Sequence, residues 1–352
     1  MITNLKIKSL KSIPEKDITL KNLTLLAGLN NSGKSTVIQA LRMFSDAANG
    51  KSPFLDGHGT FQEIRSNLVR KDQDIEIGIK GNESNDSLVI SETAISQPSS
   101  KISLIYVGAD RWGPRTFLSL HQGLDNLPQI GDKGDFVIDF IEKLSDIVID
   151  KRLHHPNSQG ETMTYELKGW LNEISPGVDF KFETNRKADI SQNEFDGFRP
   201  TNVGFGLSYT LPIIAALLSA AVNTKESSGS EFANNWIHQK ENTDLIVVLE
   251  NPEAHLHPQG QTAMGKMIAM AASCGVQILL ETHSDHLMDG IRIATKEGKC
   301  NSNDVIFHYL KKQDGETIFS SPSLLEDGKL DYWPEGFFDQ TLKNRAILAR
   351  KK

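Results

Sequence analysis

A glycine-rich loop between an apolar segment and an amphipathic segment constrains the fold of this chain more than any other feature. Residues 28–35 read Gly-Leu-Asn-Asn-Ser-Gly-Lys-Ser, which completes the pattern Gly-x-x-x-x-Gly-Lys-[Ser/Thr]. The apolar run at 23–27 predicts a strand before the loop, and apolar residues at helical spacing over 37–44 predict a helix after it. This order predicts a phosphate-binding loop at the start of an α/β nucleotide-binding fold.

The residues of this loop have distinct expected roles. Glycines let successive backbone N–H groups curve around phosphate oxygens, and the helix N-terminus adds partial positive charge. Lys34 is expected to reach the β and γ phosphates, and the Ser35 hydroxyl to ligate Mg²⁺. A glycine-rich turn capped by serine is the alternative. The predicted contact residues are Gly28, Asn30, Asn31, Ser32, Gly33, Lys34, Ser35 and Thr36.

A second magnesium ligand is expected at the end of a buried strand that lies beside the phosphate loop. Glu250, which follows the apolar run at 245–249, fits that requirement. A carboxylate that polarises the attacking water often comes next, but this chain has the neutral Asn251 there. Either Glu253 takes over that role or hydrolysis is slow, and a solvated loop carboxylate is the alternative for Glu253.

His283 follows the next apolar run, at 276–280, and is expected to contact the γ phosphate or a water bound to it. A buried histidine with satisfied hydrogen bonds is the alternative. We therefore predict Glu253 and His283 as catalytic residues, and Ser35 and Glu250 as metal ligands. His255 and His257 do not predict a metal site, because Pro258 is better placed as the first residue of a helix.

The order of elements predicts one nucleotide-binding unit with an insertion. Apolar strands alternating with helices indicate a largely parallel sheet covered on both faces. Amphipathic patterns at 135–153 and 165–175 predict two helices of an insertion or lid, with a polar separator at 185–200. The predicted divisions are 1–115 for the N-terminal part, 116–200 for the helical insertion and 201–352 for the C-terminal part.

Composition limits the environment of the chain and its partners. Its 38 Lys+Arg and 45 Asp+Glu give a net charge of −7, which argues against a surface coated in nucleic-acid-binding charge. Two cysteines among 352 residues argue against a disulfide framework and fit a reducing cytoplasm. The longest apolar run, 211–222, is shorter than the roughly 20 residues that cross a bilayer. We expect a cytoplasmic protein with no integral membrane segment.

These segments together resemble ABC-type ATPases of the SMC, RecF and OLD-like group, often described as AAA-family ATPases. The resemblance covers most of the chain, and its ending WPEGFFDQ is similar to a prokaryotic branch of the group. It implies an α/β P-loop NTPase fold, an ABC-type head with a mixed sheet and a helical insertion, and it implies ATP and Mg²⁺ as ligands. The segments that carry it are GLNNSGKST, YVGADRWGPR, NVGFGLSYTLPII, LENPEAHLHPQGQ and ETHSDHL.

The resemblance also implies a signature motif at 204–208, which reaches the γ phosphate of ATP held by a second copy. Gly206 and Ser208 would make that contact, so ATP would lie between two heads of a homodimer. Tyr209 stands where glutamine is common in relatives. A glycine turn before an apolar helix is the alternative reading of this segment.

Further roles come from the same resemblance. The loop at 254–257 would meet the partner head, and His283 would be the switch histidine. Gln62 would sense magnesium and water. Arg111 and Arg115 are similar to an arginine pair near the nucleotide, with ordinary surface arginines as the alternative.

The leading functional hypothesis is an ATP-binding and ATP-hydrolysing homodimer that controls a partner effector, such as a nuclease, in bacterial defence against phage. One alternative is a nucleotide-gated binding module with little hydrolysis, because Asn251 replaces the usual glutamate. Another is a DNA-binding, RecF-like repair or recombination ATPase, for which short basic runs supply candidate faces. A transporter subunit is disfavoured by the long separation between Lys34 and Glu250.

Overall fold

The central sheet of the computed structural model has six strands in the order β13-β12-β3-β11-β10-β6. The structure describes residues 1–81, 85–123 and 127–349. Five of the strands run parallel, and β13 pairs antiparallel with β12 at one edge. This mixed sheet confirms the predicted fold class. The strands are β3 (Leu23–Gly28), β6 (Ile102–Val107), β10 (Asp244–Glu250), β11 (Gln277–Glu281), β12 (Val305–Gln313) and β13 (Glu316–Ser320).

The carboxyl ends of these parallel strands meet at one edge of the sheet, where ligands bind in open α/β folds. β3 ends there at Gly28, and β10 and β11 end at Glu250 and Glu281, which are paired in register. β11 is the immediate neighbour of β3, and β10 lies one strand further away. The expectation that the strand of Glu250 lies beside the phosphate loop is therefore wrong, because β11 is inserted between them.

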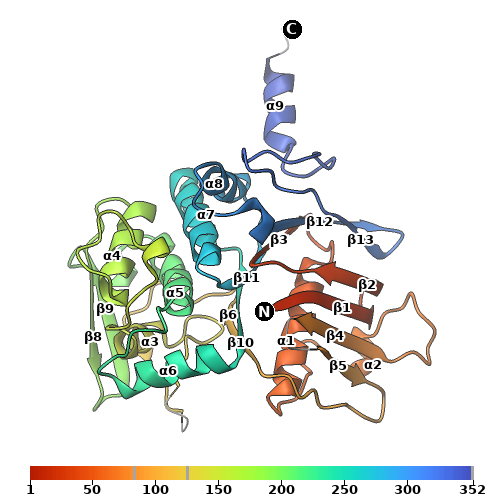
Figure 1. Cartoon of the computed structure of the whole chain (residues 1–352), viewed down its shortest axis with the longest axis horizontal. Helices are drawn as coiled ribbons and strands as arrows, with labels where there is room; N and C mark the ends of the chain where they lie inside the picture. Colours follow the sequence, from red (N-terminus) through yellow and green to blue (C-terminus); the bar gives the residue numbers. More distant parts are fainter. Residues whose placement is uncertain (82–84, 124–126, 350–352) are drawn as a thin grey trace.

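Helix α1 lies between the central sheet and a second, antiparallel sheet of order β2-β1-β4-β5 (Figure 1). Its apolar side chains, among them Ile38, Leu41 and Phe44, form one buried cluster with side chains from both sheets. The helix is thus held on two faces directly behind the phosphate loop. The elements are β1 (Ile2–Leu10), β2 (Ile13–Thr19), β4 (Ile75–Gly81), β5 (Asn85–Ile90), α1 (Lys34–Ala48) and the short α2 (Phe61–Ile64).

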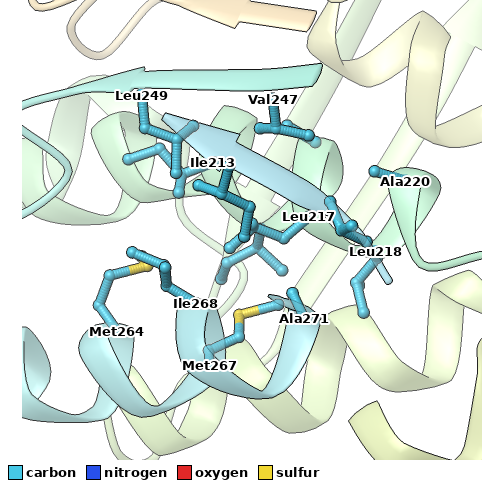
Figure 2. Close-up of a cluster of buried hydrophobic side chains, with 14 of the residues drawn as sticks. Ile213, Leu217, Leu218, Ala220, Val247, Leu249, Met264, Met267, Ile268 and Ala271 are labelled. Atoms are coloured by element: carbon cyan, nitrogen blue, oxygen red, sulfur yellow. The ribbon is translucent and has the colours of Figure 1, made fainter. Parts of the chain in front are cut away.

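Three helices cover the other face of the central sheet: α5 (Phe205–Ala220), α7 (Pro258–Ser273) and α8 (Asp285–Lys296). Pro258 begins α7, as predicted. α7 and α8 touch backbone to backbone, because a Cβ on Gly265 would lie 2.1 Å from the carbonyl oxygen of Leu287. Figure 2 shows side chains of α5 between those of β10 and α7. This layer fixes the start of α5 relative to the loop after β10.

Ile213 of α5 lies in this layer with no exposed surface. The Ile213→Val variant is expected to lower the free energy of unfolding by about 1 kcal/mol, because removing one buried carbon leaves a small cavity. Urea denaturation followed by circular dichroism measures this change. Ile318→Val on β13, where the side chain is 41% exposed, is the matched control and should change stability by less than about 0.5 kcal/mol. Equal losses in both variants would contradict the assignment of this core.

The segment 116–200 is mixed rather than purely helical. The helix expected over 135–153 is confined to α3, because Val148 and Ile149 instead form extended bridges to Thr162 and Val222. The polar separator expected at 185–200 contains β9 of a hairpin, in a small sheet of order β7-β9-β8. The elements are α3 (Val137–Lys143), α4 (Met163–Ile174), β7 (Leu118–Ser119), β8 (Phe180–Asn185) and β9 (Ile190–Phe195).

Helices α2, α6, α8 and α9 were not predicted from the sequence. α6 (Glu231–Asn242) lies within the stretch before β10; it is capped by the Ser230 hydroxyl and anchored by the buried Trp236. α9 (Gln340–Leu348) projects away from the rest of the molecule near the C-terminus (Figure 1). Within the described ranges, no helix is long and apolar enough to cross a membrane.

Candidate functional site

The loop from Gly28 to Thr36 joins β3 to α1 at the carboxyl edge of the central sheet. Gly28 has φ 150° and Gly33 has φ 104°, which are conformations that favour glycine. A Cβ on Gly33 would lie 2.3 Å from Thr317 Oγ1, and one on Gly28 would lie 2.3 Å from the carbonyl oxygen of Leu310. The hairpin of β12 and β13 therefore packs so closely against the loop that both positions require glycine.

Lys34, the first residue of α1, folds back over this loop. Its Nζ donates hydrogen bonds to the carbonyl oxygens of Gly28 at 3.0 Å and Leu29 at 3.1 Å. It also lies 3.6 Å from Glu281 Oε1, and only 4% of the Lys34 side chain is exposed. Burial lowers the pKa of Lys34, and the Glu281 carboxylate opposes that change. The ammonium group is thus held at the loop and paired with an acid.

A cavity of about 610 Å³ opens above the loop. Four cationic side chains and two acids line it, so the cavity suits an anionic ligand. The residues predicted to hold phosphate from Asn30 to Thr36 all take part in the lining. The complete lining is Lys11, Ser12, Asn30, Asn31, Ser32, Gly33, Lys34, Ser35, Thr36, Gln39, Glu63, Arg65, Asn67, Leu68, Glu281, Lys312 and Gly315.

Glu281 is an acid of the loop cavity that was not predicted from the sequence. Its Oε2 lies 3.4 Å from the Ser35 hydroxyl, so this carboxylate contacts both Lys34 and Ser35. Burial raises the pKa of Glu281, while the Lys34 charge acts in the opposite direction. Its position directly after the apolar run at 276–280 was the available signal, because carboxyl ends of parallel strands share one edge.

Glu250 lies next to Glu281 but has different partners. The Tyr106 hydroxyl donates a hydrogen bond to Glu250 Oε1 at 3.0 Å. The guanidinium of Arg42, also on α1, stacks 3.7 Å from the centre of the Tyr106 ring. Burial raises the pKa of Glu250, and the hydrogen bond from Tyr106 limits the rise. Of the two predicted metal ligands, Ser35 therefore contacts Glu281, and Glu250 is bound to Tyr106.

These oxygen groups fit a magnesium ion, which prefers hard ligands and binds through one or two carboxylates, phosphate and water. Ser35, Glu250 and Glu281 supply a hydroxyl and two carboxylates at one edge of the sheet. In the described part of the chain, no group of three or more His, Cys, Asp or Glu side chains is placed to hold a metal. A magnesium ion here would therefore share its coordination with nucleotide phosphate.

The turn after β10 carries Asn251 and Glu253. Asn251 has φ 45°, in the left-handed region that asparagine tolerates. Glu253 Oε1 accepts a hydrogen bond from the backbone N–H of His283 at 2.8 Å, which joins this turn to the end of β11. Glu253 Oε2 is buried without a hydrogen-bond partner, and burial raises the pKa of this carboxyl group. Glu253 therefore differs from the solvated carboxylate of the alternative reading.

The His283 side chain is 41% exposed, and its Nε2 lies 4.0 Å from Glu281 Oε1. Partial burial and the nearby Lys34 charge both lower the pKa of His283, which favours a neutral imidazole at pH 7. The two predicted catalytic residues, Glu253 and His283, thus lie together beside Glu281. Their arrangement leaves an imidazole at the surface next to the acids.

Arg111 lies beneath the turn after β10. Its guanidinium donates hydrogen bonds of 2.7 Å to the carbonyl oxygens of Gly108, Glu250 and Asn251, and it lies 5.1 Å from the centre of the Tyr209 ring. Burial lowers the pKa of Arg111 to about 10. This arginine therefore holds the turn in place and does not line the loop cavity.

Arg115 and Gln62 also lie outside the residues that line the loop cavity. The Arg115 guanidinium stacks 3.6 Å from the centre of the Trp112 ring. Gln62, on α2, donates a hydrogen bond to Glu92 at 2.9 Å. The roles that the resemblance implied for Arg115 and Gln62 stay predictions.

Gly206 and Ser208 lie at the start of α5, away from the residues that line the loop cavity. A Cβ on Gly206 would lie 2.8 Å from the carbonyl oxygen of His255, so only glycine allows this approach. The rings of Tyr209 and His255 meet edge to face with their centroids 4.6 Å apart, and Phe205 beside them is 54% exposed. Neither Gly206 nor Ser208 is thus among the residues that line the loop cavity of the same chain.

The arrangement of the fold matches solved heads of SMC proteins. "Crystal structure of the SmcHead bound to the C-winged helix domain of ScpA" aligns with a TM-score of 0.53 at 13% identity, covering 92% of this chain and 98% of that one. An Smc head domain from Pyrococcus furiosus, "with an extended coiled coil bound to the C-terminal domain of ScpA", aligns at 0.54 and 11% identity, covering 99% of each chain. The sequence matches no curated protein.

The strand order, the phosphate loop and these neighbours show the P-loop NTPase fold of an SMC-type head. Residues 23–289 match the family described as "AAA domain, putative AbiEii toxin, Type IV TA system". The chain therefore belongs to this family. Residues 300–348 match a second family model, "Protein of unknown function (DUF3696)".

Proposed function

We propose that this chain binds ATP with Mg²⁺ at the loop cavity and hydrolyses it between two copies of itself. The observation that carries the proposal is that the buried Lys34 lies at a cavity lined by four cationic side chains. The start of α5 does not line this cavity. ATP at the loop would therefore meet Gly206 and Ser208 only from a second copy.

Ser35, Glu250 and Glu281 would hold the magnesium ion, which supplies charge neutralisation for the terminal phosphates. Lys34 would exchange its carbonyl partners for phosphate oxygens, and the loop N–H groups would bind the remaining oxygens. These groups position the triphosphate at the edge of the sheet, where most catalysis of phosphoryl transfer comes from positioning and electrostatics.

Glu253 would act as the general base, because its buried Oε2 has an unused acceptor position and its raised pKa suits proton uptake from water. His283 would contact the terminal phosphate or the attacking water from its exposed position beside Glu281. This arrangement supports hydrolysis despite Asn251, and it favours an ATPase over a binding module with little hydrolysis.

Exposed apolar side chains support the association of two copies. Leu29 in the phosphate loop is 71% exposed, and Phe205 at the start of α5 is 54% exposed. These two segments would face each other across an ATP sandwich, so both side chains would be covered on closure. ATP would then shift the population toward the dimer, because the bridging contacts exist only in that state.

Cysteine cross-linking tests this geometry. Single variants Leu29→Cys and Phe205→Cys are made on a chain with Glu253→Gln and with Cys274 and Cys300 replaced by alanine, then mixed and treated with a short bis-maleimide. A covalent dimer is expected with ATP and Mg²⁺, and little without nucleotide. Tyr165→Cys, exposed on α4, replaces Phe205→Cys in the control mixture and should give no ATP-dependent product. A chain that stays monomeric with ATP would contradict the sandwich.

The nucleotide-dependent dimer would control a partner effector in bacterial defence against phage, such as a nuclease. The family description names a toxin of a toxin–antitoxin system, which supports a defence role. Copurification from the native host, with and without Lys34→Ala, tests this part of the proposal. A nuclease or toxin recovered only with the unsubstituted chain is the expected result, and identical partners in both preparations would contradict nucleotide control.

A further inference from the structure

Glu281, the last residue of β11, lines the loop cavity in which the proposed nucleotide and cation would bind. One carboxylate oxygen lies 3.6 Å from Lys34 Nζ, and the other lies 3.4 Å from Ser35 Oγ. The side chain is 8% exposed, so little water screens these contacts. The two loop groups expected to contact phosphate and magnesium are therefore both engaged by one acid of the same chain.

In this arrangement Glu281 competes with a triphosphate for Lys34. Both are anions, and both bind the same lysine, so a nucleotide without a cation must displace the carboxylate from Lys34. The displaced carboxylate stays beside the phosphates, because it is fixed at the end of the buried strand β11. Only 8% of the side chain is exposed, and repulsion between like charges is strong where water is scarce.

A divalent cation changes the repulsion between Glu281 and the nucleotide into an attraction. Glu281 can turn from Lys34 toward a cation next to Ser35, since its Oε2 already lies at that hydroxyl. Lys34 is then free to bind phosphate, and the acid becomes attractive for the metal–nucleotide pair. Glu250 is less suited to this exchange, because the Tyr106 hydroxyl already holds its Oε1.

We propose that Glu281 makes nucleotide binding at this loop dependent on a divalent cation: it blocks Lys34 without the cation and ligates the cation when the metal–nucleotide pair binds. The inference rests on the proposed ATP site. Beyond that site, the inference says that the chain binds the metal-bound nucleotide in preference to the free nucleotide. This selection comes from a residue of β11, not from the strand that ends at Glu250.

Equilibrium binding of a fluorescent ATP analogue, measured with Mg²⁺ and with EDTA, tests the inference. The intact chain is expected to lose about 50-fold or more in affinity when EDTA replaces Mg²⁺. Glu281→Gln, which keeps the shape of the side chain and removes its charge, should bind the analogue about tenfold more tightly in EDTA than the intact chain does. The affinity of Glu281→Gln for the analogue should therefore differ only a few-fold between Mg²⁺ and EDTA.

Glu63→Gln is the matched control, because Glu63 is the other acid that lines the loop cavity and its carboxylate caps α2 at Thr60. This variant is expected to keep the larger part of the difference between Mg²⁺ and EDTA. Equal behaviour of the Glu281→Gln and intact chains in EDTA would overturn the inference. Absence of analogue binding by the intact chain with Mg²⁺ would instead overturn the proposed ATP site, so the two failures are distinguishable.

A measurement on the intact chain keeps the inference testable if Glu281→Gln does not fold. Cobalt(III) hexaammine neutralises phosphate charge but does not exchange its ammonia ligands, so Glu281 cannot bind its metal directly. The analogue should bind much more weakly with cobalt(III) hexaammine than with Mg²⁺. Equal affinity with both cations would overturn direct ligation by Glu281.

Discussion

The Lys34→Ala variant is expected to lose at least about 100-fold in kcat/KM for ATP hydrolysis, the largest loss expected of any cation that lines the loop cavity. Lys34 Nζ is held at the carbonyl oxygens of the loop, where it can transfer to phosphate oxygens with little rearrangement. Its removal also leaves the Glu281 carboxylate buried without its ion-pair partner, so negative charge faces the incoming nucleotide. Steady-state phosphate release measures the loss.

Lys312→Ala is the matched control for this prediction. Lys312 lines the same cavity, but its side chain is exposed at the end of β12, where solvent screens its charge. We expect a change of only a few-fold from its removal. Equal rates for Lys34→Ala and the intact chain would contradict the assignment of the whole site.

A double variant separates the stability effect of Lys34→Ala from its effect on ATP. Truncation of Lys34 alone should destabilise the chain, because an uncompensated buried charge remains at Glu281. Adding Glu281→Gln removes that charge and should recover most of the lost stability in urea denaturation. ATP hydrolysis should stay low in the double variant, since neither change replaces the lysine.

The phosphate loop and its flanking elements could be predicted from the sequence because their signals are local. The glycines of the pattern from Gly28 to Ser35 take positive φ angles that this residue favours, and the apolar spacing after the pattern is that of a helix. Glu253 and His283 were found by their positions after buried strands. The structure joins them through one hydrogen bond between segments 30 residues apart.

Glu281 was missed because its partner Ser35 lies 246 residues away and the contact depends on strand order. The metal-ligand role expected for Glu250 placed its strand beside the phosphate loop, but β11 lies between β10 and β3 and brings its last residue to the loop. The contacts of Arg111 could not be predicted for a similar reason. Its three carbonyl partners come from the ends of β6 and β10, which meet only when those strands pair.

The small sheet in the insertion was missed for a different physical reason. β9 carries Ser191, Gln192 and Asn193, whose polar side chains resemble those of a loop. Pairing with β8 on one side and β7 on the other stabilises the strand, while Phe195 contributes to the core. Tertiary contacts thus stabilise this strand, although the local preference of its residues for extended structure is weak.

The Glu253→Gln variant is expected to lose at least about 100-fold in the rate of ATP hydrolysis while it still binds ATP and Mg²⁺. Glutamine keeps the size of the side chain and its acceptor for the His283 N–H, but its amide cannot take a proton from water. ATP should therefore remain bound, and the ATP-dependent dimer should persist. Phosphate release under single-turnover conditions measures the chemical step, and gel filtration with ATP measures the dimer.

The pH dependence of hydrolysis gives a second readout for Glu253. Burial raises the pKa of its carboxyl group above the ordinary 4.5, and only the deprotonated form can act as a base. Hydrolysis by the intact chain should therefore fall as the pH drops through this raised pKa. The residual rate of Glu253→Gln should lack that acidic limb, whereas the exposed control Glu335→Gln should keep both the rate and the limb. An unchanged acidic limb in Glu253→Gln would assign proton uptake to another group.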